Sequence, residues 1–184
     1  MTTCTYRLNA LEKETTLTLD ETTLRVEREG RLEQRPLSHI TAVRLSCNPS
    51  RVDLGRYDCR LETRDGARLT VCSTTYLGFG KFGSQAPAYG TFVRELHDRL
   101  APLGGIRFAR GDPPLRFYGS LGCFIASLLL VFAAPLATGL LFMPRVAAAK
   151  LLVMIFFIPW IIRYAKLNRP RSYEPSLIPD TMLP

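Results

Sequence analysis

The sequence predicts an α+β protein, in which an antiparallel β-sandwich or barrel is capped by one C-terminal amphipathic helix and followed by a two-helix transmembrane hairpin. Three observations support this prediction. Residues 15–73 alternate apolar and polar side chains, residues 87–105 carry a helical apolar stripe, and residues 117–143 contain no charge. The predicted organisation is a soluble β domain at 1–112, a helix hairpin at 113–166 and a proline-rich extended tail at 167–184.

The alternating segment contains short strands separated by turn signals. Leu24 and Val26 alternate with charged residues, and Glu29-Gly30 and Asp65-Gly66 mark turns, the latter a strong signal for a tight hairpin. About six or seven strands result, most with one apolar face, as in antiparallel sheets with one solvated side. The expected apolar positions are Leu17, Leu19, Leu24, Val26, Leu32, Leu37, Ile40, Val43, Leu45, Tyr57, Cys59, Leu61, Leu69 and Val71.

One helix is predicted to close the β domain. Pro87 suits a first helical turn, and Gly104-Gly105 ends the helix. The apolar residues between them recur at helical spacing and form a single stripe, which we expect to plug the open end of the sandwich. The stripe comprises Tyr89, Phe92, Val93, Leu96 and Leu100. His97 follows it and is expected to be partly exposed or capping, and neither His97 nor His39 belongs to a catalytic arrangement.

This order of strands and helix resembles that of bacterial pleckstrin-homology-like domains. The segment Arg35-Pro36-Leu37-Ser38-His39-Ile40-Thr41-Ala42-Val43 is similar to the beginning of one of their strands, and the resemblance covers roughly residues 5–105. Many such domains lie beside transmembrane helices in bacterial membrane proteins. The resemblance implies an interaction module rather than an enzyme.

Two apolar segments follow the β domain. Phe117–Met143 runs 27 residues without a charge, which exceeds the length needed to cross a hydrocarbon core of about 30 Å. The second span, Val146–Ile162 with a helix continuing to about residue 165, contains Lys150 near its end, where a lysine can snorkel to the headgroups. Met143-Pro144-Arg145 makes a tight connection, so we expect an antiparallel hairpin.

Aromatic and basic side chains flank these spans. The expected membrane anchors are Arg116, Trp160, Arg163, Tyr164 and Lys166. Seven basic residues flank the outer ends of the hairpin and only Arg145 and Lys150 lie at its turn. The positive-inside rule therefore predicts a multi-pass protein of the inner (plasma) membrane with both termini in the cytoplasm.

The charge and cysteine content excludes several function classes. The net charge is +8, and the residues after Asp112 contribute seven basic and two acidic side chains, so most of the excess lies beside membrane segments rather than in a nucleic-acid-binding domain. The five cysteines are not spaced as metal ligands would be, and their number is odd. We therefore expect no nucleic acid partner, no metal, no cofactor and no disulfide framework.

The segment Gly78-Phe79-Gly80-Lys81-Phe82-Gly83-Ser84 is the one candidate ligand site. It satisfies Gly-x-Gly-x-x-Gly with a lysine inside and precedes a helix, so Gly78, Gly80, Lys81, Gly83 and Ser84 are candidate ligands for an anion or lipid headgroup. It lacks the βαβ context of a dinucleotide site and the Gly-Lys-Ser/Thr of a P-loop. The favoured interpretation is a flexible loop whose Phe79 and Phe82 touch the membrane surface.

Two further patterns concern packing. Small residues at Gly122/Ala126 and Ala133/Ala137 favour close helix approach, within the hairpin or in a homodimer. The tail has regularly spaced prolines and the apolar residues Tyr173, Leu177, Ile178, Met182 and Leu183, which favour an extended path in a groove of the β domain or of a partner. Disorder is the alternative for the tail.

The sequence thus favours a membrane-anchored, cytoplasm-facing interaction module that binds a protein partner or anionic lipid headgroups. The alternative is an accessory subunit of a transport or envelope-assembly membrane complex, whose helix hairpin is the working surface. A third, weaker alternative is an enzyme acting on a phosphorylated lipid through residues 78–84. Because no catalytic residue set can be argued, the leading prediction is not an enzyme.

Overall fold

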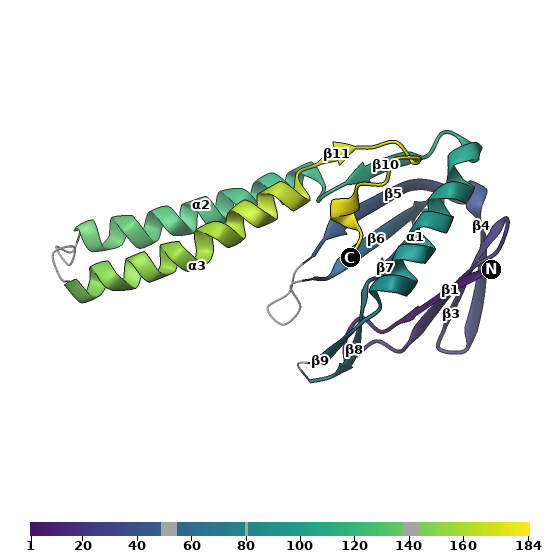
Figure 1. Cartoon of the computed structure of the whole chain (residues 1–184), viewed down its shortest axis with the longest axis horizontal. Helices are drawn as coiled ribbons and strands as arrows, with labels where there is room; N and C mark the ends of the chain where they lie inside the picture. The colour runs from purple at the N-terminus through teal and green to yellow at the C-terminus, as the bar shows by residue number, and fades with distance from the viewer. Residues whose placement is uncertain (49–54, 80, 138–143) are drawn as a thin grey trace. The chain divides into compact units, whose positions relative to one another are not determined.

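Strands come first along the chain and two long helices come later, as the computed structural model shows (Figure 1). The structure describes residues 1–48, 55–79, 81–137 and 144–184, with the backbone alone at 132–137, 144–147, 149–151, 153 and 154. The described chain forms two compact units, Met1–Gly111 with Arg171–Pro184 and Asp112–Pro170.

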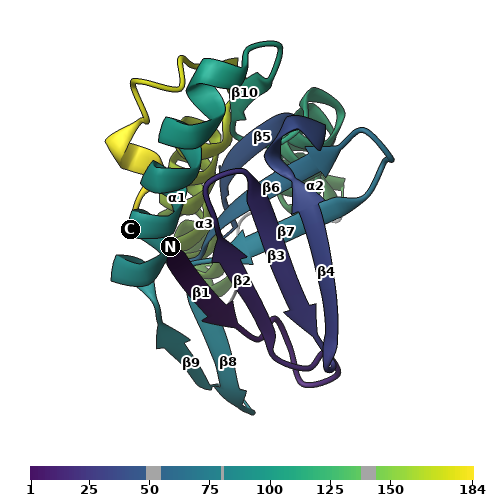
Figure 2. The same ribbon diagram turned by 90° about the vertical axis from the view of Figure 1, so that its right-hand side faces the viewer.

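The β-rich unit contains two main sheets (Figure 2). The first sheet is an antiparallel meander in the order β1-β2-β3-β4, and the second has the order β11-β10-β5-β6-β7. The strands of these sheets are β1 (Thr2–Tyr6), β2 (Thr15–Leu19), β3 (Thr23–Arg28), β4 (Arg31–Pro36), β5 (Ile40–Cys47), β6 (Tyr57–Thr63), β7 (Arg68–Cys72), β10 (Arg107–Arg110) and β11 (Arg171–Ser172). A further two-stranded sheet joins β8 (Thr74–Gly78) to β9 (Lys81–Ser84).

Helical elements complete the two units. In the β-rich unit α1 (Ala86–Leu100) continues into the 3₁₀ turn η2 (Ala101–Leu103), while η1 (Leu37–His39) links the two sheets and η4 (Asp180–Met182) lies in the tail. The second unit consists of α2 (Pro114–Ala137) and α3 (Pro144–Asn168). The predicted α+β class is confirmed. Residues 138–143, which include the end of the predicted first span and Met143 of the predicted connection, lie outside the described residues.

The predicted apolar positions form the core of the β-rich unit. Alternation buries one face of β2, β3, β5, β6 and β7, and the five predicted stripe residues of α1 are all fully buried against them. The helix ends near the predicted glycines, and Gly104 has a φ of 63°, which favours glycine. The predicted helix and its buried face are therefore confirmed.

The two predicted turns form, with one difference in length. Glu29 and Gly30 both have positive φ, as a two-residue hairpin connection requires. In the second hairpin, Thr63 pairs with Ala67, so three residues rather than two make the turn, and Gly66 takes a φ of 80°. Three-residue hairpin loops place a glycine at such a left-handed position.

The edge strand β4 departs from the predicted pattern. The alternation expected Leu32 to contribute to the apolar face, but Leu32 is 59% exposed. In the register, Leu24 faces Arg35 and Val26 faces Glu33, so charged side chains of β4 share the side of the sheet that carries the core residues. Inward-pointing charges on an edge strand discourage pairing with another chain.

The tail belongs to the β-rich unit. β11 pairs antiparallel with β10, which itself adds parallel to β5. Beyond β11, Met182 is buried in the core, with Tyr173, Ile178 and Leu183 packed against it, whereas Leu177 is exposed. Of the two alternatives for the tail, the structure has the docked one, with its groove in the chain's own β domain.

Candidate functional site

The helix pair of the second unit is fastened at one end by polar side chains. The Tyr164 hydroxyl donates to Asp112 Oδ2 at 2.9 Å and lies 2.8 Å from Ser120 Oγ. The Asp112 N–H donates to the Asn168 carbonyl at 3.0 Å, which joins the start of α2 to the end of α3. The helices are therefore antiparallel neighbours, with Arg116, Trp160, Arg163, Tyr164 and Lys166 near the joined end.

Aromatic rings continue this contact along the pair. Trp160 packs edge-on against Phe124 at 5.2 Å and stacks with Tyr164 at 6.1 Å, and Tyr164 stacks with Phe117 at 6.1 Å. The predicted anchors Trp160 and Tyr164 therefore serve packing between the helices, a role that the interpretation as an interfacial aromatic belt did not include. Arg116, Arg163 and Lys166 are exposed.

Many of the described apolar side chains of the pair are exposed. Leu129 is 64% exposed and Leu130 is 69% exposed, and on α3 the side chains of Ile155, Phe156 and Phe157 are exposed as well. Over Pro114–Val131, α2 is long and apolar enough to cross a membrane, and only 6% of this stretch is buried. Among the residues searched, this is the one helix that meets the length and composition criteria.

The small-residue pattern of α2 does not pack within the described part of the pair. Gly122 and Ala126 are exposed, and a Cβ built on Gly122 would meet no atom within 4 Å. Contacts with α3 use the aromatic side chains of α2 instead. The interpretation that Gly122/Ala126 pack within the hairpin is therefore wrong, while the side chains of Ala133 and Ala137 lie outside the described residues.

Gly78 and Lys81–Ser84 belong to a β-hairpin rather than to the flexible loop that the sequence favoured. Thr74 pairs with Ser84, Thr75 with Gly83 and Tyr76 with Phe82. Leu77 lies close to the backbone of Gly83. A Cβ at position 83 would come 3.1 Å from Leu77 Cδ1, so a glycine fits there. Phe82 packs edge-on against Tyr76 at 5.7 Å instead of reaching outward.

This hairpin geometry bears on the proposed anion site. Successive amides of a strand point to opposite sides, whereas an anion cradle needs successive amides that converge. Ser84 Oγ accepts from the Ala86 N–H at 3.4 Å at the start of α1, and Gly80 lies outside the described residues. Of the candidate ligands, exposed Lys81 remains available to an anion.

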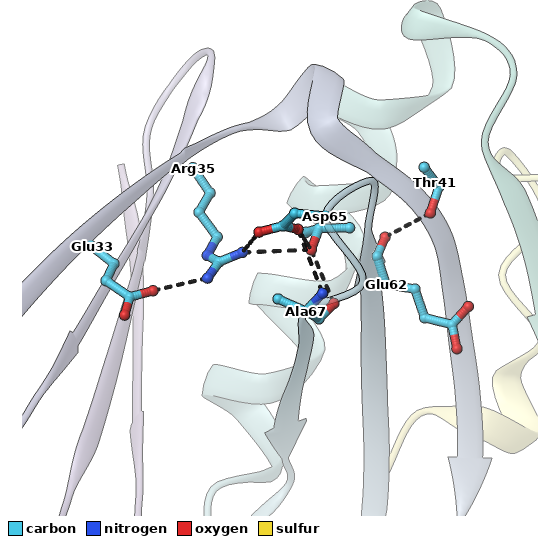
Figure 3. A network of polar contacts seen from close by, with 7 residues as sticks. Glu33, Arg35, Thr41, Glu62, Asp65 and Ala67 are labelled. Atoms are coloured by element: carbon cyan, nitrogen blue, oxygen red, sulfur yellow. Dashed lines mark hydrogen bonds and ion pairs between the residues drawn. The ribbon is translucent and has the colours of Figure 1, made fainter.

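A charged network that sequence reasoning missed joins β4 to the β6–β7 turn. Figure 3 shows Arg35 between two carboxylates, with Nη2 3.0 Å from Glu33 Oε2 and Nη1 3.0 Å from Asp65 Oδ2. Asp65 also accepts from the Thr63 hydroxyl and from the Ala67 N–H. The hydroxyl of Thr63, together with that N–H and Arg35, lowers the pKa of Asp65.

Two clefts adjoin this network on the β-rich unit. The first, of about 350 Å³, is lined by Glu33, Gln34, Arg35, Pro36, His39, Thr63 and Asp65. The second, of about 530 Å³, shares Glu33 and is lined by both charged and apolar side chains. Its other lining residues are Tyr6, Leu8, Glu12, Thr15, Val26, Arg28, Glu29, Arg31, Arg68, Leu69 and Thr70. No sequence signal marks these clefts, because their lining residues come from strands β1 to β4, β6 and β7, from η1 and from three connections between strands.

The strand β7 presents one edge beside the second cleft. In the described sheet β7 pairs with β6 alone, and the bonds from Thr63 to Ala67 and from Ser73 to Tyr57 set which residues face β6. By strand alternation the backbone groups of Arg68 and Thr70 point away from β6. The Tyr6 hydroxyl accordingly donates to the Thr70 carbonyl from that side.

His97 is fully buried, which corrects the expectation of a partly exposed or capping residue. Its Nδ1 donates to the Val93 carbonyl at 2.7 Å, so in the neutral ring Nε2 accepts from the Tyr173 hydroxyl at 2.6 Å. Burial lowers the pKa of His97 below its usual value of 6.5. The residue therefore fastens the tail to α1.

The cysteines are free thiols, and four of the five are buried. Burial raises the pKa of Cys4 to about 11, and it raises the pKa of Cys59 and Cys72 further. Such thiols are inert packing residues. Across the described residues, no group of three or more His, Cys, Asp or Glu side chains could hold a metal ion.

Comparison with known proteins adds no relative. No family model, no curated protein and no solved structure matches this chain.

Proposed function

We propose that this chain is a membrane-anchored, cytoplasm-facing interaction protein. In this proposal the α2–α3 pair crosses the inner membrane as a two-helix hairpin, and the β-rich unit binds a protein partner or lipid headgroups. The observation that carries the proposal is the outward-facing apolar surface of α2, of which only 6% is buried over Pro114–Val131. In water this would be an extensive unpartnered patch, whereas hydrocarbon chains satisfy it.

The charge distribution of the helix pair supports the orientation. The exposed basic residues Arg116, Arg163 and Lys166 lie at the end where α2 begins and α3 finishes. Basic side chains near helix ends remain on the cytoplasmic side of a membrane. Both connections to the β-rich unit leave from this end, so that unit and both termini are proposed to be cytoplasmic.

The strand order supports a pleckstrin-homology-like domain as the interaction module. A four-stranded meander, β1 to β4, precedes a three-stranded meander, β5 to β7, and an amphipathic helix follows and closes the core. This is the order that the sequence resemblance implies. The hairpin β8–β9 and the added strands β10 and β11 are extensions to it.

Membrane insertion is tested with the native chain. The protein should remain in membranes after alkaline carbonate extraction, and the fluorescence of Trp160, its one tryptophan, should be quenched by lipids brominated on their acyl chains. Extraction into the supernatant, with Trp160 quenched only by aqueous iodide, would contradict the anchor.

Orientation has a separate test. A reporter active only in the cytoplasm should be active when fused after Pro184 and inactive when fused at Arg145. Activity at both positions would rule out two crossings. Activity at Arg145 alone would mean that the protein has the opposite orientation, with its C-terminus outside the cytoplasm.

The β7 edge and its adjoining clefts are the proposed surface for a protein partner. An extended segment could pair with the backbone of Arg68 and Thr70 while its side chains reach the charged walls, which is the strand-addition mode of recognition. A photocrosslinking residue at Arg68 should capture a partner protein. Thr70→Pro should abolish this capture, because proline removes the N–H at the edge of the strand. The same probe at exposed Leu103 should capture none. Capture that persists in Thr70→Pro would exclude strand addition.

The exposed Gly122/Ala126 face favours a second candidate function. An accessory subunit of a transport or envelope-assembly complex would pack a partner helix there, where no described side chain covers α2. Gly122→Leu would then release a copurifying membrane protein and leave membrane insertion intact. Leu115→Ile, on an exposed position near the helix start, is the matched control. No loss of partner with Gly122→Leu would dismiss the candidate.

A further inference from the structure

The β8–β9 hairpin has a fixed base and an exposed apolar end. At the base, the Tyr76 N–H donates to the Arg7 carbonyl at 2.8 Å, and the Arg7 N–H donates to Thr75 Oγ1 at 3.0 Å. The Arg7 guanidinium also lies 5.6 Å from the centre of the Tyr76 ring. The hairpin is therefore held to β1 through Arg7.

The side chains near the turn contrast with this base. Phe79 is 100% exposed and Leu77 is 69% exposed, and Lys81 beside them is exposed too. A fully exposed phenylalanine next to an exposed leucine has no role in packing of this unit. Two apolar side chains and a cation form too small a surface for a stable protein interface, but they match shallow insertion between lipid headgroups.

The chain itself brings a bilayer within reach, provided that the anchor proposed above is correct. Only residues 111–113 separate β10 from α2, and only residues 169 and 170 separate α3 from β11. Two connections this short keep the β-rich unit close to the membrane surface. A contact too weak to bind free protein is then populated, because the tether supplies a high effective concentration.

We propose that the β8–β9 hairpin is a second membrane contact, in which Leu77 and Phe79 enter the headgroup region of an anionic bilayer and Lys81 pairs with lipid phosphates. The inference rests on the proposed membrane anchor and adds to it a surface that the anchor does not need. Charge complementarity selects the occupant, since Lys81 favours the anionic cytoplasmic leaflet.

The test uses the full-length chain in vesicles of phosphatidylcholine with phosphatidylglycerol. Trp160→Phe removes the native tryptophan, and Phe79→Trp on that background reports the hairpin. The emission of the Phe79→Trp probe should shift to the blue and be quenched by lipids brominated near the headgroup, but not by aqueous iodide. Leu32→Trp on the same background is the matched control, because Leu32 is likewise exposed but lies on β4. It should be quenched by iodide alone.

The contribution of the Lys81 charge is tested separately. Lys81→Gln should lower the equilibrium constant for membrane contact of the hairpin about fivefold on anionic vesicles, as expected for the loss of one lysine charge near such a surface, and change little on phosphatidylcholine alone. An equal loss on both lipids would contradict pairing with anionic headgroups.

Three results would overturn the inference. If iodide quenched the Phe79→Trp probe as strongly as the Leu32→Trp probe, the hairpin would lie in water. Equal quenching of both probes by brominated lipid would make the contact nonspecific. A blue-shifted Phe79→Trp probe that brominated lipid does not quench would place the hairpin against protein, in a second copy or a partner. Failure of the anchor is recognised separately, because Trp160 of the native chain would then escape acyl-chain quenching.

Discussion

α1 and α2 both carry many apolar side chains, yet α1 buries them and α2 exposes them. In α1 the five stripe residues are fully buried and the other faces carry charge. In α2 apolar residues occur on every face, and only 6% of Pro114–Val131 is buried. The β-rich unit supplies an apolar environment for one face of α1, whereas in the proposal above lipid supplies it for α2. The comparison teaches that the same residue types serve water and lipid, and that their angular distribution distinguishes the two.

The largest effect should come from truncating the α1 stripe. Phe92→Ala removes a fully buried ring and should lower the free energy of unfolding of the β-rich unit by about 3–5 kcal/mol. Leu129→Ala in α2 should change it by about 0.5 kcal/mol or less, because that side chain contacts solvent rather than the core. Denaturant titration of the full chain in mild detergent measures both. Equal effects would break the comparison.

A charge on the exposed side of α2 should interfere with insertion. Leu129→Arg should disfavour membrane integration by about 2.5–3.5 kcal/mol, the cost of arginine near the middle of a span. The fraction integrated in a membrane-insertion assay reports it. Leu32→Arg, on exposed β4, should insert like the native chain. Normal insertion of Leu129→Arg would mean that this face of α2 does not meet lipid.

The docked tail sharpens the comparison within the β-rich unit. Met182→Ala should destabilise that unit by about 2 kcal/mol, since Met182 is buried in the core, whereas exposed Leu177→Ala should have almost no effect. Thermal unfolding of the full chain distinguishes the two variants. If the two variants melted alike, the tail would not be docked in solution.

The smallest effect concerns His97 and acid. Because burial lowers its folded-state pKa below the unfolded value of about 6.5, the unfolded chain binds more protons as the pH falls below that value. The His97 contribution to stability is intact above about pH 6.5 and is lost as the pH falls through the folded-state pKa. The free energy of unfolding should therefore fall between pH 7.5 and pH 5.5.

Variants isolate this contribution from that of the carboxylates. His97→Gln should remove that part of the pH dependence, while His39→Gln, at an exposed position, should keep it. Unfolding free energies at several pH values provide the measurement. If the pH dependence were unchanged in His97→Gln, the neutral His97 ring would not contribute to stability through its contact with the tail.

Much of the β-rich unit follows from local patterns in the sequence. Alternation located β2, β3, β5, β6 and β7, and the spacing of Tyr89 to Leu100 located α1 and its buried face, because burial on one side imposes the period of the element. β1, which precedes the predicted alternating segment, and the strands β8 to β11 were missed. The strands β10 and β11 pair with segments that are distant in the chain. The strands β8 and β9 form a hairpin of their own, which is rich in glycine and lacks apolar–polar alternation.

The candidate surfaces were harder to predict for a physical reason. Residues 78–84 resemble a glycine motif locally, but the pairing of β8 with β9 decides the conformation of Gly78 and of Lys81–Ser84. Arg35 and Asp65 are 30 residues apart, and only the fold of the two sheets joins them. The sequence placed His97 next to the apolar stripe, where partial exposure is expected. The residue that covers it is Tyr173 of the tail, which is 76 positions further along the chain. Contacts of long sequence separation leave no periodic signal.

The most direct test of the account is the reactivity of Cys123 towards a membrane-impermeant maleimide. Cys123 is the one cysteine that the structure exposes, and it lies within α2, while the other four are buried in the β-rich unit. The account predicts that Cys123 in native membranes stays unlabelled and becomes labelled after denaturation in detergent, while an added cysteine at exposed Ser84 is labelled throughout. Labelling of Cys123 in membranes as fast as that of the cysteine at position 84 would contradict the assignment of α2 to lipid.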